Sequence, residues 1–255
     1  WLGLDKSTSE PVRATFILTA IWYAIFSLPL FFKTPDNPSL NKKVTEAVRN
    51  GFIQLKISIK EVGKFKNIVK FLFARMFYND AVVTIFAMGG VYAAGTFDMD
   101  EEQILMFGIG LNVTAGLGAF AFAWLDDKSG SKFTINASIL GLLIPLVALI
   151  IVKDITWFIV WGLILGIFVG PTQAASRSFM ARLSPPELTN QMFGLLALSG
   201  KVTSFIGPFL VGLLTVQFGS QRLGMSAILV LLLIGLLLMF TVKEHEAPGI
   251  EVNPE

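Results

Sequence analysis

Seven long apolar stretches restrict the fold of this chain more than any other feature. They cover residues 14–32, 68–94, 103–125, 133–152, 155–179, 192–217 and 223–242. Each is close to or above the roughly 20 residues that a helix needs to cross a bilayer. Backbone groups in lipid must bond within their own segment, and no alternating barrel pattern is present. Because hydrophobic residues make up 54% of the chain and charged residues 15%, we predict an all-α integral membrane protein with seven transmembrane helices.

Basic residues in the connections predict the orientation in the membrane. If the connections alternate between the two sides, one side carries twelve: Lys33, Lys42, Lys43, Arg49, Lys56, Lys60, Lys64, Lys66, Lys128, Lys132, Arg182 and Lys243. The other side carries Lys6, Arg13, Lys153 and Arg222 and the acidic loop "GTFDMDEEQ". The positive-inside rule therefore predicts that the first side, including the C-terminus, is cytoplasmic.

This topology predicts four parts. Residues 1–32 hold an outside segment and one helix, 33–67 a basic cytoplasmic linker, 68–242 six further helices, and 243–255 a cytoplasmic tail. Within the linker, apolar residues recur every three or four positions, at Val44, Val48, Phe52, Leu55, Ile59 and Val62. This spacing predicts an amphipathic helix at the inner membrane surface, joining two membrane blocks. A calmodulin-like partner could bind the same pattern.

Several site chemistries have no residues here to support them. The chain has no cysteine, and its one histidine, His245, lies in the polar tail. A disulfide framework or a thiolate metal site is thus excluded, and we expect no cofactor. The net charge of +2 needs no nucleic-acid partner, because topology accounts for the basic residues. The chain begins at Trp1, and we expect it to be a fragment.

A loop motif lies between the third and fourth predicted helices, in "AWLDDKSGSKFT". It resembles the G-x-x-x-D-[RK]-x-G-[RK]-[RK] loop of the major facilitator superfamily through Asp127, Lys128, Gly130 and Lys132. Ala123 and Ser131 depart from that pattern. We expect a tight turn at Gly130 and a capping or pairing role for Asp127.

Three longer blocks narrow the resemblance. They are "FYNDAVVTIFAMGGVYAAG", "GPTQAASRSFMARLSPPE" and "FGLLALSGKVTSFIGPFLVG" followed by "FGSQRLGM". These are similar to the vacuole-effluxer branch of that superfamily, which includes fungal autophagy-related amino-acid effluxers and bacterial homologues. The resemblance implies the sixth helix, central linker and second half of a transporter in a bacterial inner membrane, with the first half missing. It also implies that the second and fifth helices line the cavity, and that the sixth flanks the interface between halves.

Lys201 is the charge that most needs explanation. It lies about 13 Å of helical rise into the sixth predicted helix, where an unpaired lysine costs about 2.5 to 3.5 kcal/mol. In the second helix, Asp80 points about 140° away from Arg75, so Asp80 is free to meet another helix. We expect Lys201 or Arg177 to neutralise Asp80.

Seven intramembrane polar residues are our candidates for a substrate or proton pathway: Arg75, Tyr78, Asn79, Asp80, Gln173, Arg177 and Lys201. Asp80 is the deep carboxylate that proton coupling would use. Three structural alternatives stay open. Asp80 and Lys201 could form a structural ion pair, and Arg75 could reach the cytoplasmic surface. Pro171, near Gln173 and Arg177, could break its helix and line a cavity or only kink it.

Another polar pair is expected to pack rather than bind. Asn112 and Thr114 lie in a glycine-rich helix, and we expect both to bond across helices. Gly108, Gly110, Gly116 and Gly118 mark the predicted close-packing face of that helix.

Three functions fit these residues. The first is a secondary transporter of a small polar solute, an amino acid by resemblance, working by alternating access with possible coupling to protons. The second is a membrane scaffold without transport. The third is a hydrolase using Lys201 and Ser204, disfavoured because one helix carries both groups and no oxyanion donors are evident. The phosphate-loop pattern at "GLLALSGKV" fails because Val202 stands where Ser or Thr is required.

Overall fold

A computed structural model describes residues 10–34 and 44–243. The predictions for Lys6, Lys42, Lys43, His245 and the tail 244–255 lie outside these residues. The chain divides into two units, residues 1–51 and 52–255, and each is described by itself. Within the described ranges, seven helical segments are long and apolar enough to cross a membrane and no strand is present. The all-α prediction and all seven predicted spans are therefore confirmed.

The first unit contains helix α1 (Glu10–Lys33), whose apolar side chains are exposed along its length. Helix α2 (Val44–Val62) continues from this unit into the second and covers the segment predicted to be amphipathic. The side chains of Phe52, Leu55 and Ile59 lie outside the described residues. The placement of the linker helix at the membrane surface remains a prediction.

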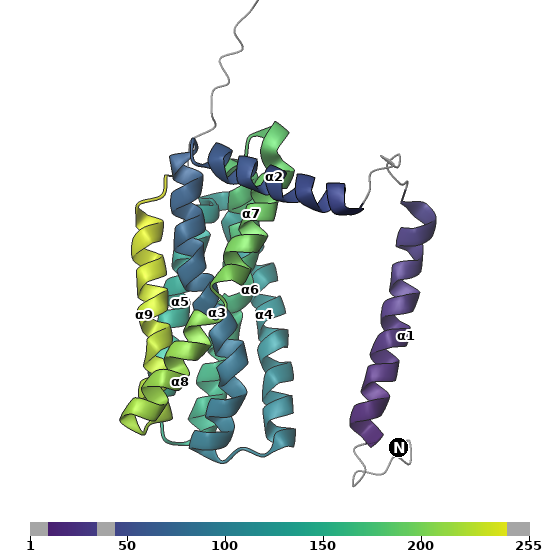
Figure 1. Cartoon of the computed structure of the whole chain (residues 1–255). Helices are drawn as coiled ribbons and strands as arrows, with labels where there is room; N and C mark the ends of the chain where they lie inside the picture. The colour runs from purple at the N-terminus through teal and green to yellow at the C-terminus, as the bar shows by residue number, and fades with distance from the viewer. Residues whose placement is uncertain (1–9, 35–43, 244–255) are drawn as a thin grey trace, which may run out of the picture. The chain divides into compact units, whose positions relative to one another are not determined.

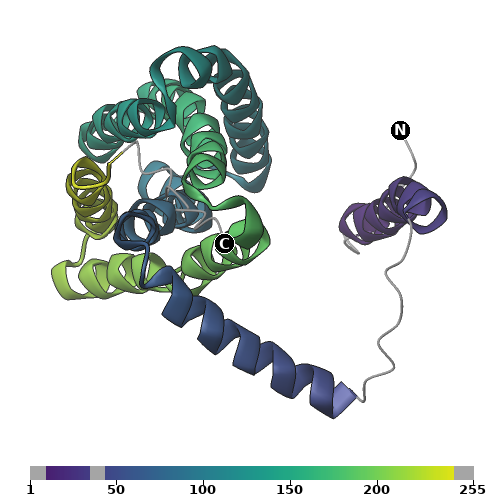
Figure 2. The same cartoon turned by 90° about the horizontal axis from the view of Figure 1, so that it is seen from above.

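The second unit is a helical bundle. It comprises α3 (Lys66–Phe97), α4 (Glu101–Ser129), α5 (Ser131–Ile151), α6 (Ile155–Leu183), the 3₁₀ helix η2 (Pro186–Leu188), α7 (Thr189–Val202), α8 (Ile206–Phe218) and α9 (Gln221–Phe240). Helix α3 lies in the middle and contacts α4, α6, α7, α8 and α9 (Figure 2). Helices α7 and α8 follow one another alongside α3 and together form the sixth predicted span (Figure 1).

Acidic residues of the short connections explain where two helices begin. Asp100 accepts a hydrogen bond from the backbone N–H of Gln103, and the Gln103 side chain accepts one from the backbone of Asp100, which together form a capping box. Asp154 accepts from Thr156 and Trp157 in the same manner. Side-chain oxygens at these positions satisfy N–H groups that a helix leaves unpaired. The acidic loop thus has a local structural role in starting α4.

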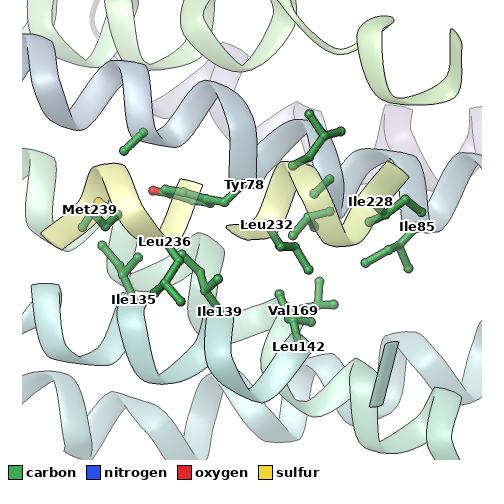
Figure 3. Packing of buried hydrophobic residues seen from close by; sticks show 14 of the residues in the cluster. Tyr78, Ile85, Ile135, Ile139, Leu142, Val169, Ile228, Leu232, Leu236 and Met239 are labelled. Atoms are coloured by element: carbon green, nitrogen blue, oxygen red, sulfur yellow. The ribbon is translucent and has the colours of Figure 1, made fainter. Parts of the chain in front are cut away.

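The apolar core lies between α3, α5, α6 and α9. Figure 3 shows Tyr78 of α3 beside Ile135 and Ile139 of α5 and Leu236 of α9, all of them buried. A Cβ atom on Gly235 would meet the backbone nitrogen of Tyr78 at 2.9 Å, so this glycine lets α9 approach α3 closely. Helix α3 is thereby held on one side by packing, and its polar residues at other angles meet other helices.

The end of α9 is joined to the start of α3 through one side chain. Asn67 donates to the carbonyl of Lys243 at 2.6 Å and accepts from its N–H at 2.7 Å. We expect Asn67→Ala to lower the free energy of unfolding by about 1 to 3 kcal/mol, because it leaves part-buried backbone groups unpaired. Thermal unfolding measures this loss. Asn136→Ala is the matched control, since its Oδ1 atom is buried without a hydrogen-bond partner, and an equal loss there would contradict the assignment.

Candidate functional site at the broken sixth span

The sixth span is interrupted between Val202 and Ile206. The backbone N–H of Ser204 donates to the carbonyl of Lys201 at 3.4 Å, and that of Ile206 donates to the carbonyl of Thr203 at 2.9 Å. A tight turn thus replaces the α-helical pattern. Pro208 explains the position of the break. It has no N–H for the carbonyl four residues earlier, but its ring is tolerated in the first turn of a helix such as α8.

The break lies one span later than the sequence suggested. A break at Pro171 was one expected outcome, and it is wrong, because α6 continues as one helix from Ile155 to Leu183 through that proline. A proline at this position leaves the carbonyl of Ile167 without its helical partner. Gly118 of α4 lies so close to that carbonyl that an added Cβ atom would overlap it. The α4 backbone therefore covers the carbonyl that Pro171 leaves unpaired.

Two polar side chains of α3 contact the end of α7. Arg75 donates through Nη1 to the carbonyl of Leu196 at 2.6 Å and to the hydroxyl of Ser199 at 3.2 Å. Asn79 donates to the carbonyl of Gly200 at 3.5 Å. The guanidinium therefore lies against α7 inside the bundle, and the expectation that it could reach the membrane surface is wrong.

Asp80 contacts the start of α8. Its side chain is only 1% exposed, and Oδ2 accepts the backbone N–H of Gly207 at 2.9 Å. The other carboxylate oxygen, Oδ1, is buried without a hydrogen-bond partner. Thr84 lies on the same side of α3, and an added Cβ atom on Gly207 would overlap its hydroxyl. Only a glycine permits α8 to come this close to α3.

The expected ion pair of Asp80 with Lys201 or Arg177 is wrong. Both cationic side chains are exposed, and Asp80 is bonded to a backbone N–H instead. The salt bridge in the described ranges joins Arg182 to Asp126 at 3.7 Å. The sequence indicated that the buried carboxylate of Asp80 needs a partner. It contained no pattern to show that this partner would be the backbone N–H of an interrupted helix.

The remaining candidates lie on α3 and α6. The Tyr78 hydroxyl is 2.8 Å from that of Ser176, and the side chain is buried in the core. Gln173 and Arg177 lie four residues apart on an exposed face of α6. Arg177 follows Ser176 directly, and its charge interacts with that of Arg75. The structure thus groups Arg75, Arg177 and Tyr78 around the contact of α3 with α6.

Lys201 completes this region from α7. It lies in the last turn of that helix, next to Gly200, whose added Cβ atom would be 2.8 Å from Arg75 Nη1. The side-chain hydroxyl of Ser204 donates to the carbonyl of Lys201 at 2.9 Å. Its hydroxyl is therefore paired with the backbone, and no hydrogen bond joins it to the Lys201 ammonium among the described residues. The arrangement gives no support to a serine-lysine hydrolase.

The loop motif lies at the C-terminal end of α4. Gly130 joins α4 to α5 with a φ angle of +86°, as expected for the predicted tight turn. Asp127 is exposed inside the last turn of α4 and accepts no hydrogen bond from a described residue, whereas its neighbour Asp126 is buried and paired with Arg182. The capping role expected of Asp127 is thus wrong.

The motif cations have different surroundings. Lys128 lies over the ring of Trp124 at 4.8 Å, and Lys132 is half-buried near the start of α5. A cavity of about 200 Å³ adjoins this end of the bundle, lined among others by Asp126, Thr134 and Pro171.

Helix α4 shows the predicted close packing in part. Added Cβ atoms on Gly110 and Gly118 would meet α6, but those on Gly108 and Gly116 would meet nothing within 4 Å. The expectation of bonds across helices is wrong: Asn112 donates to Gly108 of its own helix and Thr114 to Leu111.

No group of three candidate metal ligands occurs in the part of the chain that the structure describes. The residues of this region that sequence reasoning did not single out are Pro208, Gly207 and Asp126. Pro208 was visible in "FIGPFLVG" and could have located the break.

Comparisons with known proteins agree with a transporter. The model of the family described as "Vacuole effluxer Atg22 like" matches residues 3–248. An uncharacterized MFS-type transporter, YxiO, from Bacillus subtilis is 25% identical over 97% of this chain and 57% of its own length. Autophagy-related protein 22 is 25% identical in Cryptococcus neoformans and 23% identical in Saccharomyces cerevisiae. These matches cover 88% and 91% of this chain and 43% and 50% of the fungal proteins.

The chain therefore spans about half the length of these relatives. The family match extends over nearly all of the sequence and over every helix of the bundle. The chain belongs to the family of Atg22-like vacuole effluxers, which are membrane transporters of the MFS type.

Proposed function

We propose that this chain is part of a secondary transporter that moves a small solute carrying a carboxylate, such as an amino acid, by alternating access. The observation that carries the proposal is the set of three cations Arg75, Arg177 and Lys201. None of them contacts an acidic side chain among the described residues. Counted from Thr189, Lys201 lies about 18 Å of helical rise into the span, so its charge is near the middle of a bilayer of about 30 Å.

An uncompensated cation at the depth of Lys201 has an energetic cost. It costs about 2.5 to 3.5 kcal/mol even on lenient scales, unless water or an opposite charge is near. A transient carboxylate supplies that opposite charge while it is bound. Membrane sites for anionic solutes commonly combine basic groups with the ends of interrupted helices, and here Lys201 lies in the last turn of α7 and Arg75 bonds the same half-helix.

The orientation, the membrane, the missing half and the further solute-binding residues in this proposal are those predicted from the sequence. The C-terminus and the basic linker face the cytoplasm, and the membrane is a bacterial inner membrane, as the similarity to the Bacillus protein suggests. The partner of this half is the missing N-terminal half, which forms the other wall of the solute pathway. The two halves rock against each other around the binding site. In this proposal Asn79 and Gln173 would bond polar groups of the solute, and Asp80 is the group that proton coupling would use.

Counterflow of labelled amino acids in proteoliposomes tests this proposal, using the complete protein. We expect Arg177→Gln and Lys201→Gln each to raise the half-saturating solute concentration about tenfold or more, because hydrogen bonds to charged groups contribute about 1.5 to 3 kcal/mol. Amino-acid amides, which lack the carboxylate, should compete poorly.

The control is Lys153→Gln, at an exposed position beyond the end of α5, which should transport normally. Equal transport by the two site variants and the native protein, with amides competing as well as acids, would overturn carboxylate recognition. A pH gradient applied in the same assay tests coupling to protons. Absence of flux across a broad solute panel would favour a scaffold.

A further inference from the structure

Both ends of the break in the sixth span are bonded to one short segment of α3. Arg75 and Asn79 bond carbonyls of α7, and Asp80 bonds an N–H of α8. Arg75 and Asp80 are five residues apart, which is about 7.5 Å of helical rise. The interruption between α7 and α8 covers the three residues Thr203, Ser204 and Phe205. One short segment of α3 thus contacts both half-helices.

The charges of these side chains have the signs that the helix ends require. The C-terminal end of a helix carries partial negative charge on unpaired carbonyls, and the N-terminal end carries partial positive charge on unpaired N–H groups. Arg75 lies against the last two turns of α7, where it bonds the carbonyl of Leu196 and the hydroxyl of Ser199, and Asp80 lies at the N-terminal end of α8. Each charge is thus placed against the helix end of opposite sign.

The two half-helices have no sufficient caps of their own. Phe205 occupies the capping position of α8 and makes no side-chain hydrogen bond there. Thr203 lies beyond the end of α7, and its hydroxyl donates to the carbonyl of Ser199 at 3.2 Å and to that of Met76 at 3.3 Å. The N–H of Gly207 is therefore satisfied by a carboxylate from another helix.

Glycines allow both contacts. An added Cβ atom on Gly200 would lie 2.8 Å from Arg75 Nη1 and 3.1 Å from Asn79 Nδ2. On the other side of the break, Gly207 lies against Thr84 and the Asp80 carboxylate. A side chain at position 200 would displace the ends of Arg75 and Asn79 from their carbonyls, and one at position 207 would overlap the Thr84 hydroxyl.

We propose that residues 75–80 of α3 act as a clamp that holds both half-helices of the broken sixth span against α3, so that loss of the clamp exposes the break. Arg75 and Asn79 fix the end of α7, and Asp80 fixes the start of α8 as a cap supplied from another helix. Asp80 is then a positioning residue whose essential property is a hydrogen-bond acceptor for Gly207. The consequence that the clamp orients Lys201 toward the solute rests on the proposed function, whereas the clamp itself does not.

Paired substitutions at position 80 test the clamp without any solute. Asn keeps an acceptor and Leu removes it with the same branched shape and number of heavy atoms, and Asn is nearly equal to Asp as a helix cap. The chain has no cysteine, so Ser204→Cys reports the exposure of the break to a thiol reagent once any cysteines elsewhere in the complete protein are replaced. We expect Asp80→Leu to raise the labelling rate about tenfold, and Asp80→Asn to change it less than twofold.

A control separates the clamp from a general loss of stability. Tyr92→Phe removes the hydrogen bond from its hydroxyl to the carbonyl of Leu149 at 3.0 Å, elsewhere on α3, and should leave labelling at position 204 unchanged. A second arm, Arg75→Met, should raise labelling as Asp80→Leu does.

Native labelling in Asp80→Leu, or equal increases in the Asn and Leu variants, would overturn the clamp. Failure of amino-acid transport with the expected labelling pattern would count against the proposed function alone.

Discussion

Replacing Gly118 with alanine is expected to lower the free energy of unfolding of the bundle by about 3 kcal/mol. An added Cβ atom there would overlap the carbonyl oxygen of Ile167 on α6. Backbone cannot move aside as a flexible side chain can, so α4 and α6 must separate along their contact. Overpacking of this kind costs about 1 to 3 kcal/mol in soluble cores and sometimes more. We expect the upper end of that range, because the atom that clashes belongs to the backbone.

Gly116→Ala is the matched control for this prediction. It lies two residues away on the same helix, and an added Cβ atom there would meet nothing within 4 Å. Both changes add the same methyl group and the same helix propensity, which favours alanine by about 1 kcal/mol. Thermal unfolding of the purified protein compares the two. A Gly118→Ala protein as stable as Gly116→Ala would contradict the close backbone contact between α4 and α6.

The spans were predictable because they depend on local composition. Long apolar runs and the helix starts at Asp100 and Asp154 are properties of a few neighbouring residues. The difference between Asp126 and Asp127 was not predictable in this way. Adjacent residues on a helix point about 100° apart, and the packing of α4 against α6 decides which carboxylate faces Arg182. The motif pattern alone favoured Asp127.

Two prolines show why the break was placed incorrectly. Pro171 and Pro208 each leave a carbonyl without a helical partner. On α6, the backbone of the neighbouring helix α4 covers that carbonyl at Gly118, and α6 continues. On the sixth span, α3 supplies polar side chains on both sides and the helix is interrupted. The outcome depends on which helix lies beside each proline, and sequence spacing contains little information about that neighbour.

Pro208→Ala should close the break and reduce transport about tenfold or more. Alanine restores an N–H for the carbonyl of Ser204 and removes the ring that opposes a continuous helix. A proline in a helix interior costs about 3 kcal/mol relative to alanine, so the substitution favours the continuous form by up to about a hundredfold. One charged hydrogen bond from Asp80, at about 1.5 to 3 kcal/mol, resists this change incompletely. Labelling of Ser204→Cys should therefore fall.

Pro171→Ala provides the control, because its helix is already continuous and labelling at position 204 should stay at the native rate. In a continuous sixth span the N–H of Gly207 would bond the carbonyl of Thr203, and the buried carboxylate of Asp80 would lose its partner. The Pro208→Ala protein should then be less stable when Asp80 is retained than when Asp80→Asn is added, because a neutral amide costs less to bury than a charge. Native labelling and full transport in Pro208→Ala would contradict the role of Pro208 in keeping the span broken.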